Sequence, residues 1–244
     1  MNNKTRAKLI IRSIILITIT LLTLIDVKLL SKVMTTNIAG NIKVYMLLWM
    51  YLMYEMIVVF IPAFSLHSYS GKIYLKHFNE VENYSIEKLN KFTNENSIRA
   101  KKAILFWITL NLGIFIIFKI FNIDIVYMYF LFLFYYWSDM FCVNVWCPFH
   151  KIIVKNKCCN ECRIYNWGHI MYLTPLIFIN NIYTQSLVFM GLIIFIQWEY
   201  MNNKYPERMS SISNKSLRCG DCDNLCRFNK LKREKVKEQT VKSI

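Results

Sequence analysis

Seven of the eight cysteines fall in two short windows of the chain. The first window holds Cys147, Cys158, Cys159 and Cys162, and the second holds Cys219, Cys222 and Cys226. In each window two cysteines are separated by two residues, a spacing that lets a tight turn direct two thiolates at one tetrahedral ion. These pairs are Cys159 with Cys162 and Cys219 with Cys222. We therefore predict that the two pairs together bind one metal centre, either zinc or an iron–sulfur cluster.

Further side chains near these pairs are candidate additional ligands. They are Cys147, Cys158, Cys226 and His150. They would allow a second site, or an iron–sulfur cluster held by the second window and one residue of the first. Two hypotheses without a metal stay open. Redox-active dithiols would make the protein a membrane thiol–disulfide oxidoreductase, whereas inert thiols would pack as small apolar side chains.

The composition predicts that both windows belong to an integral membrane protein. Hydrophobic residues make up 55% of the chain and charged residues only 18%, against about a quarter in soluble domains. The apolar residues form long runs separated by short charged stretches, which is typical of an all-α protein that crosses the membrane several times. The sequence contains no Gly-rich phosphate loop and no Ser/His/Asp, HExxH or paired-carboxylate hydrolase pattern. It therefore indicates neither a nucleotide-binding enzyme nor a hydrolase.

We expect four membrane-spanning helices followed by a short helical hairpin. The helices are predicted at residues 9–30, 44–66, 103–121 and 125–146. The apolar region 170–198 is too long for one untilted span. Because Asn180 and Asn181 interrupt it, we interpret this region, extended back to residue 167, as two helical arms. Both arms are short for a bilayer core of about 30 Å, so the sequence leaves open whether the hairpin crosses the membrane or is re-entrant.

Positive charge decides the predicted orientation. With both termini in the cytoplasm, the cytoplasmic segments contain 26 of the 30 Lys and Arg residues, as the positive-inside rule requires. These segments are 1–12, 65–102, 147–169 and 201–244. Both cysteine windows then face the reducing cytosol, where metal binding is favoured over stable disulfides. We expect the net charge of +15 to contact anionic lipid head groups of the cell membrane.

The chain divides into three parts. Residues 1–146 are predicted to form the transmembrane bundle, 147–200 the first cysteine window and the hairpin, and 201–244 a basic cytosolic tail with the second window. In the tail, acidic residues alternate with basic ones at helical spacing, which favours a solvated helix or a disordered end over a nucleic-acid-binding segment. The loop 65–102 is predicted to carry a short amphipathic helix on the membrane surface. Its apolar residues are Phe78, Val81, Leu89 and Phe92.

Polar residues inside the predicted helices need partners. The three that stand out are Glu55, Asn111 and Asp139. A carboxylate in the middle of a membrane helix is costly unless it is protonated or paired. We therefore predict a hydrogen bond between Glu55 and Asn111, which lie at similar depth. The alternative is that Glu55 and Asp139 form a proton or cation path, as in a transporter or a metal sensor.

Polar residues also share one face of the predicted helix 125–146. They are Tyr135, Asp139, Cys142 and Trp146, at spacings of four, three and four residues. Because these spacings match the helical repeat, the face leads towards Cys147. Two interpretations stay open, namely an inward polar stripe satisfied by tyrosine hydroxyls and a proton or electron route to the first cysteine window.

The cysteine-bearing part of the chain is similar to a family of membrane proteins. The similarity is carried by the runs WCPFH (146–150), KNKCCNECRIYNW (155–167), LTPL (173–176), WE (198–199), PER (206–208) and LRC (217–219). These runs resemble an uncharacterised family of prokaryotic cysteine-rich multi-pass membrane proteins. The resemblance starts at residue 146 and implies a shared cysteine-bearing hairpin module, but no particular activity.

Overall fold

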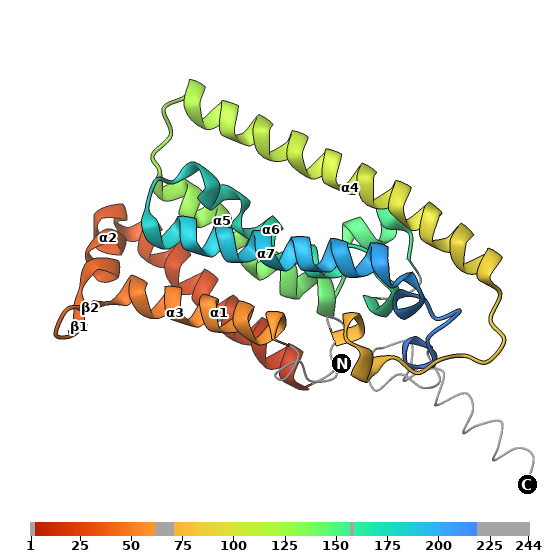
Figure 1. Ribbon diagram of the computed structural model, residues 1–244. Coiled ribbons are helices and arrows are strands. Elements are labelled where there is room, and N and C mark those ends of the chain that lie inside the picture. Colours follow the sequence, from red (N-terminus) through yellow and green to blue (C-terminus); the bar gives the residue numbers. More distant parts are fainter. Residues whose placement is uncertain (1–2, 62–70, 157–158, 219–244) are drawn as a thin grey trace, which may run out of the picture.

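The computed structural model describes residues 3–61, 71–156 and 159–218 (Figure 1). The longer helices and the strands are α1 (Asn3–Ile25), α2 (Val27–Thr35), β1 (Asn37–Ala39), β2 (Ile42–Lys43), α3 (Val44–Phe60), α4 (Ile86–Ile120), α5 (Val126–Asn144), α6 (Gly168–Leu173) and α7 (Ile182–Lys204). Short 3-10 helices cover Gly71–Ile73, Leu75–His77, Cys159–Glu161, Tyr165–Trp167, Thr174–Phe178, Pro206–Met209 and Lys215–Leu217, and a π-helical turn covers Phe149–Val154.

The long helices have the length and composition of membrane spans. Within the described residues four helices are long and apolar enough to cross a bilayer, namely Arg6–Ile25 of α1 and the whole of α4, α5 and α7. Their outward side chains are apolar too, and Leu24 of α1 is 78% exposed. Such a surface is stable against hydrocarbon rather than water. The prediction of an all-α membrane protein is therefore confirmed at the level of its helices.

The first predicted helix is divided in two by Asp26. Asp26 has an extended backbone, and its carboxylate accepts a hydrogen bond from the backbone N–H of Lys28 at 2.8 Å. It therefore caps α2, and α1 ends at Ile25 rather than at residue 30. The short antiparallel hairpin β1–β2, with Gly40 at φ +56°, then turns the chain back into α3. α3, predicted as the second span, is an apolar helix of 17 residues that ends at Phe60 rather than at residue 66. It is therefore shorter than the four candidate spans, which include α7 in its place.

The predicted surface helix in the loop 65–102 is wrong, because residues 86–102 belong to α4 while Phe78 and Val81 precede that helix. α4 begins after Ser85, whose hydroxyl accepts a hydrogen bond from Lys88 N, and it continues without a break for 35 residues. The sequence contains no Gly or Pro between residue 86 and Gly113 that could interrupt it. At 1.5 Å per residue α4 is about 52 Å long. It therefore extends well beyond a bilayer core of about 30 Å.

The predicted hairpin has one short arm and one long arm. The short arm consists of α6 and the 3-10 helix Thr174–Phe178, with Pro175 at the start of the 3-10 helix. Asn181 caps the second arm, since its side chain accepts a hydrogen bond from Tyr183 N at 2.9 Å. The turn therefore lies at the predicted asparagines. The second arm is longer than predicted, because α7 has 23 residues and reaches Lys204.

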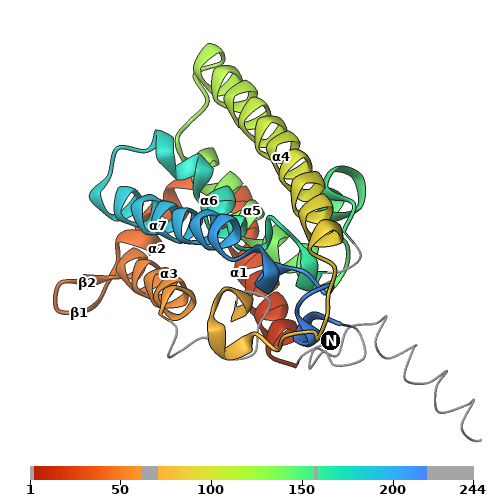
Figure 2. The same cartoon turned by 45° about the vertical axis from the view of Figure 1, so that its right-hand side comes forward.

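α1, α3, α5 and α7 lie side by side, with the short α6 between α5 and α7 (Figures 1 and 2). The larger apolar core fills the space between these helices and includes Leu52, Phe132 and Ile194. α4 lies to one side of this group. Aromatic side chains connect α4 to the other helical elements. The ring centroids of Trp107 on α4 and Tyr135 on α5, for example, are 4.8 Å apart.

The connecting segments gather at the two ends of the bundle (Figure 1). One end carries β1–β2 and the turns before α5 and before α7. The other end, which we call the cysteine end, carries residues 71–85, 145–156, 159–167 and 205–218. A second, smaller core lies at the cysteine end around Trp198. The segments predicted to be cytoplasmic are thus on one side of the bundle wherever the structure describes them.

Candidate functional site

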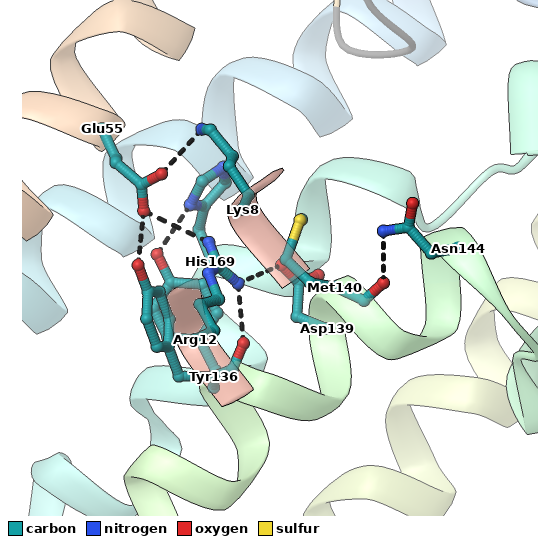
Figure 3. Close-up of polar contacts among 9 residues, drawn as sticks. Lys8, Arg12, Glu55, Tyr136, Asp139, Met140, Asn144 and His169 are labelled. Carbon is teal, nitrogen blue, oxygen red and sulfur yellow. Dashed lines mark hydrogen bonds and ion pairs between the residues drawn. The ribbon is translucent and has the colours of Figure 1, made fainter. Parts of the chain in front are cut away.

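A buried arginine joins three helices at the centre of a polar cluster (Figure 3). Arg12 of α1 is only 4% exposed. One of its terminal nitrogens donates hydrogen bonds to the carbonyl oxygen of Tyr136 at 2.6 Å and to Asp139 Oδ2 at 3.0 Å. The other donates to Glu55 Oε2 at 3.2 Å. The guanidinium also lies 3.5 Å from the centroid of the Tyr136 ring, so α1, α3 and α5 all meet at this side chain.

Glu55 has several polar contacts in this cluster. Besides Arg12, it forms an ion pair with Lys8 at 2.6 Å and accepts a hydrogen bond from the Tyr136 hydroxyl at 2.7 Å. We call Lys8, Arg12, Glu55 and Asp139 the ion-pair cluster; it contains two cations and two carboxylates. Lys8 is 47% exposed, so the cluster reaches the surface of the bundle on this side. A balanced cluster of this kind allows charges to remain buried among membrane helices.

The predicted hydrogen bond between Glu55 and Asn111 is wrong. Asn111 instead donates from its amide nitrogen to the carbonyl oxygen of Trp107, one turn earlier on α4, at 2.9 Å. Sequence reasoning missed Arg12 as the partner because it treats a basic residue near the end of an apolar run as an orientation charge. Two features of the sequence mark Arg12 as a candidate partner. Arg12 lies within the apolar run that starts at Leu9, and it follows Lys8 by four residues, on the same helical face.

Asp139 connects the ion-pair cluster to a neighbouring cavity. Its Oδ2 atom accepts the hydrogen bond from Arg12, and the residue also contributes to the cavity wall. The start of α6 packs closely against it, since a Cβ atom added to Gly168 would lie 2.5 Å from Asp139 Oδ1. Only glycine allows this approach. On the same side, His169 Nδ1 and the Tyr172 hydroxyl are 2.9 Å apart.

Four cysteines line this cavity, which has a volume of about 410 Å³. They are Cys142, Cys147, Cys159 and Cys162, and we call the space the thiol cavity. The wall also contains Asp139, His150 and a large share of aromatic side chains. Helical spacing predicts one shared face of α5, and all four residues of that face contribute to the cavity wall. They are Tyr135, Asp139, Cys142 and Trp146.

Cys142 and Cys147 form a hydrogen-bonded pair in the wall. The Cys142 thiol donates to the sulfur of Cys147, which lies just beyond the end of α5. The Cys147 sulfur also accepts a hydrogen bond from the backbone N–H of His150 at 3.4 Å, at the start of the π-helical turn. These donors stabilise the thiolate. They lower the pKa of Cys147 to about 7, and the Cys142 hydrogen bond has the largest effect.

Cys159 and Cys162 are held by a tight turn. The backbone N–H of Cys162 donates to the carbonyl oxygen of Cys159 at 3.1 Å. Buried Lys72 fixes this turn from outside, since its Nζ donates to the carbonyl oxygens of Asn160 at 2.6 Å and of Cys162 at 3.3 Å. Cys162 is 7% exposed, and burial raises the pKa of its thiol to about 11.

The segment that leads to the second cysteine window folds back on this turn. Glu161, between the two cysteines of the turn, accepts a hydrogen bond from Ser211 N at 3.0 Å. Arg218, the last described residue, donates from Nε to the carbonyl oxygen of Ser211 at 3.1 Å. A bidentate ion pair between Arg163 and Glu199 joins the turn to α7. The described chain therefore ends close to the turn that carries Cys159 and Cys162.

The predicted metal ligands are only partly within the described residues. Cys158, Cys219, Cys222 and Cys226 lie outside them. Within 3–61, 71–156 and 159–218, no group of three or more His, Cys, Asp or Glu residues is placed to hold a metal ion. Cys147, His150, Cys159 and Cys162 share the wall of the thiol cavity without forming such a group. No disulfide joins any of the cysteines that the structure describes.

Comparisons of the chain with protein-family models, with curated proteins and with solved structures find no match. The family resemblance in the cysteine-bearing part therefore stays a prediction.

Proposed function

We propose that this multi-pass membrane protein carries a thiolate metal centre at its cysteine end, with Cys159, Cys162, Cys219 and Cys222 as ligands. The observation that carries the proposal is the hydrogen bond between Glu161 and Ser211. It brings the chain that precedes the second cysteine window onto the turn that forms the first half of the site. The long sequence separation between the two pairs is therefore no obstacle to a shared centre.

The turn that carries Cys159 and Cys162 supports the proposal. The 3-10 helix Cys159–Glu161 brings both cysteines of the pair to the thiol cavity. Such turns are the usual way to direct two thiolates at one ion. Because two cysteines cannot complete a tetrahedral site, further ligands must come from elsewhere, and the second window supplies two at the same spacing.

The charges around the turn favour a thiolate centre. Four thiolates around Zn²⁺ leave two negative charges, which need compensation in a partly buried place. The buried ammonium group of Lys72 is bonded to the turn itself, and Arg218 directly precedes Cys219. Zinc would lock the tail to the bundle, whereas an iron–sulfur cluster would carry electrons.

The proposed side of the membrane is the cytoplasm. The described basic segments lie at the cysteine end, and Lys28, Lys32, Lys43 and Lys119 belong to elements at or near the other end. The positive-inside rule then orients the cysteine end inwards, next to anionic lipid. The cytosol also keeps thiols reduced and available to a metal.

Metal content tests the proposal directly. Purified full-length chain should contain one metal centre by elemental analysis, and its absorption spectrum separates zinc, which is silent, from an iron–sulfur cluster. The double variant Cys219→Ser/Cys222→Ser should lose the metal, and its Cys159 and Cys162 should react with a maleimide as they do in chelator-treated wild type. Cys142→Ser is the matched control and should keep the metal.

Retention of the metal by the double variant would mean that Cys219 and Cys222 are not its ligands. If the double variant retains its metal and Cys159 and Cys162 stay protected, the shared centre is wrong. The first window would then have to complete its own coordination with Cys147 or His150.

A further inference from the structure

The thiol cavity reaches the membrane-facing surface of the bundle. Phe134 and Trp146 both contribute to its wall, yet they are 44% and 50% exposed. Phe134 belongs to the span α5, and Trp146 lies just beyond the end of that helix. At this depth the surroundings are hydrocarbon and the bilayer interface. A ligand can therefore enter the cavity from the lipid phase.

The wall of the cavity suits a flat, apolar ligand. Aromatic rings from α4, α5 and the π-helical turn surround it, among them Trp107, Tyr135 and Phe149. Aromatic side chains bind other rings by stacked or edge-to-face contacts. The volume of about 410 Å³ lies within the range of small-molecule sites, about 300 to 1,000 Å³.

The same wall holds a thiol pair that can be oxidised. Cys142 and Cys147 line the same wall and are five residues apart at the end of α5, so a local movement of this chain end suffices to bring their sulfur atoms to the disulfide distance of about 2.05 Å. The pair is reduced in the structure. Neither cysteine is among the four ligands of the proposed metal centre, although two of those ligands, Cys159 and Cys162, line the same cavity.

We propose that the thiol cavity binds a lipid-soluble quinone and that Cys142 and Cys147 reduce it. The two S–H bonds break and one S–S bond forms between Cys142 and Cys147. Two electrons and the two thiol protons pass to the two carbonyl oxygens of the quinone, which leaves as the quinol. The reverse reaction uses a quinol to reduce the disulfide.

The apolar character of the cavity explains why the acceptor belongs to this class. An acceptor that took electrons alone would leave two protons and a net charge in a place that solvates charge poorly. A quinone takes up both electrons and both protons that the two thiols release, so the reaction leaves no additional charge in the cavity. It is also flat and partitions into the lipid phase, as the wall and the opening require.

Oxidation of the reduced full-length protein in detergent by duroquinone tests the proposal. All ring carbons of duroquinone are substituted, which disfavours direct addition of a thiol to the ring. We expect one quinol to form per protein molecule, together with a disulfide between Cys142 and Cys147 identified by peptide mass spectrometry. Cys142→Ser and Cys147→Ser should each abolish both products.

Variants that narrow the cavity distinguish a bound quinone from simple thiol oxidation. Val143→Phe and Ser138→Leu enlarge wall residues and leave both thiols in place. At least one should keep the melting temperature of wild type, lose the reaction with duroquinone and still form the disulfide with the small oxidant diamide. Absence of the disulfide with duroquinone in wild type overturns the proposal, whether or not diamide produces it. Unchanged duroquinone reactivity in a folded narrowed variant overturns the assignment to this cavity.

Discussion

At the scale of single residues, Arg12 determines how the membrane helices can pair. Its guanidinium contacts acceptors on two other helices and replaces the hydration that both carboxylates would lose on burial. Tyr136 contributes a hydroxyl, a carbonyl oxygen and a ring face to the same cluster. Because all these groups depend on one another, removal of the central cation leaves the buried carboxylate of Glu55 and the partly buried carboxylate of Asp139 without their shared partner.

We therefore expect Arg12→Gln to destabilise the protein by about 3 to 5 kcal/mol, the usual result of breaking a buried ion pair. Arg6→Gln is the matched control, because Arg6 lies on the same helix and is exposed. Thermal unfolding of both variants in the same detergent measures the difference. Equal melting temperatures for the two variants would mean that the cluster contributes no net stability.

The thiol pair Cys142 and Cys147 gives a second prediction at this scale, on how alkylation of Cys147 depends on pH. Since the pKa of Cys147 is lowered to about 7, its alkylation rate should rise through pH 7 and level off about one pH unit above it, where the thiolate dominates. Cys162, whose pKa is raised to about 11, should react more slowly than Cys147 over this range, with or without a metal. Site-resolved mass spectrometry after brief iodoacetamide treatment measures both rates.

Replacements of Cys142 identify what lowers the pKa of Cys147. Cys142→Ala removes the donor, so the rise in Cys147 alkylation should move to higher pH. Cys142→Ser keeps an O–H donor, so the pH at which Cys147 alkylation rises should stay closer to the wild-type value than in the alanine variant. If the alanine and serine variants titrate alike, the hydrogen bond is not what stabilises the thiolate.

The sequence identified which buried residues need partners, but not which partners they find. Glu55 and Asp139 stand out because a charge within an apolar run is visible in one dimension. Arg12, however, is 43 residues from Glu55 and 127 from Asp139, and hydropathy carries no information about contacts over such separations. The helical spacing of Tyr135, Asp139 and Cys142 did predict a shared face, because that relation is local.

At the scale of elements, α5 and α6 approach each other so closely that one position must be glycine. A Cβ atom at Gly168 would contact Asp139 Oδ1, and Asp139 cannot simply turn away because Arg12 holds its other oxygen. We expect Gly168→Ala to lower stability by about 1 to 3 kcal/mol, as overpacking does. The melting temperature in detergent measures it.

Gly113 offers a matched control for this substitution. It lies inside α4, and an added Cβ atom there meets nothing within 4 Å. Gly113→Ala should therefore leave stability unchanged or raise it by up to about 1 kcal/mol, because alanine is the better helix former. A loss at Gly113 as large as that at Gly168 would show that a general loss of glycine flexibility, rather than contact with Asp139, is responsible.

Helix boundaries were harder to predict than the helices themselves. Hydropathy located the apolar part of α4, but it assigned residues 86–102 to a separate element because charge marks the edge of a membrane, not the end of a helix. The backbone continues because no glycine or proline interrupts that stretch. At Asp26 the reverse holds, since a side-chain cap divides a helix inside a region that hydropathy treats as continuous.

At the scale of the whole molecule, the two ends of the bundle differ in charge and therefore in predicted location. The cysteine end should face the cytoplasm and the β1–β2 end the outside. On a cysteine-free background, Asn41→Cys should react with a membrane-impermeant maleimide in intact cells. Asn203→Cys, exposed near the end of α7, should react only after lysis. Labelling of Asn203→Cys in intact cells would reverse the orientation.

The ion-pair cluster also determines the order in which the helices can assemble during synthesis. Ribosomes add about 5 to 20 residues per second, so Glu55 follows Arg12 by about 2 to 9 s and Asp139 follows it by about 6 to 25 s. Before Glu55 is synthesised the guanidinium has no carboxylate partner, and it must extend towards the lipid head groups to keep its hydration. Its second carboxylate partner is missing until Asp139 follows. α1 can therefore insert early but cannot take its final depth and rotation until α5 has entered the membrane. Chains interrupted before α5 would expose an arginine-bearing helix to the quality-control machinery of the membrane.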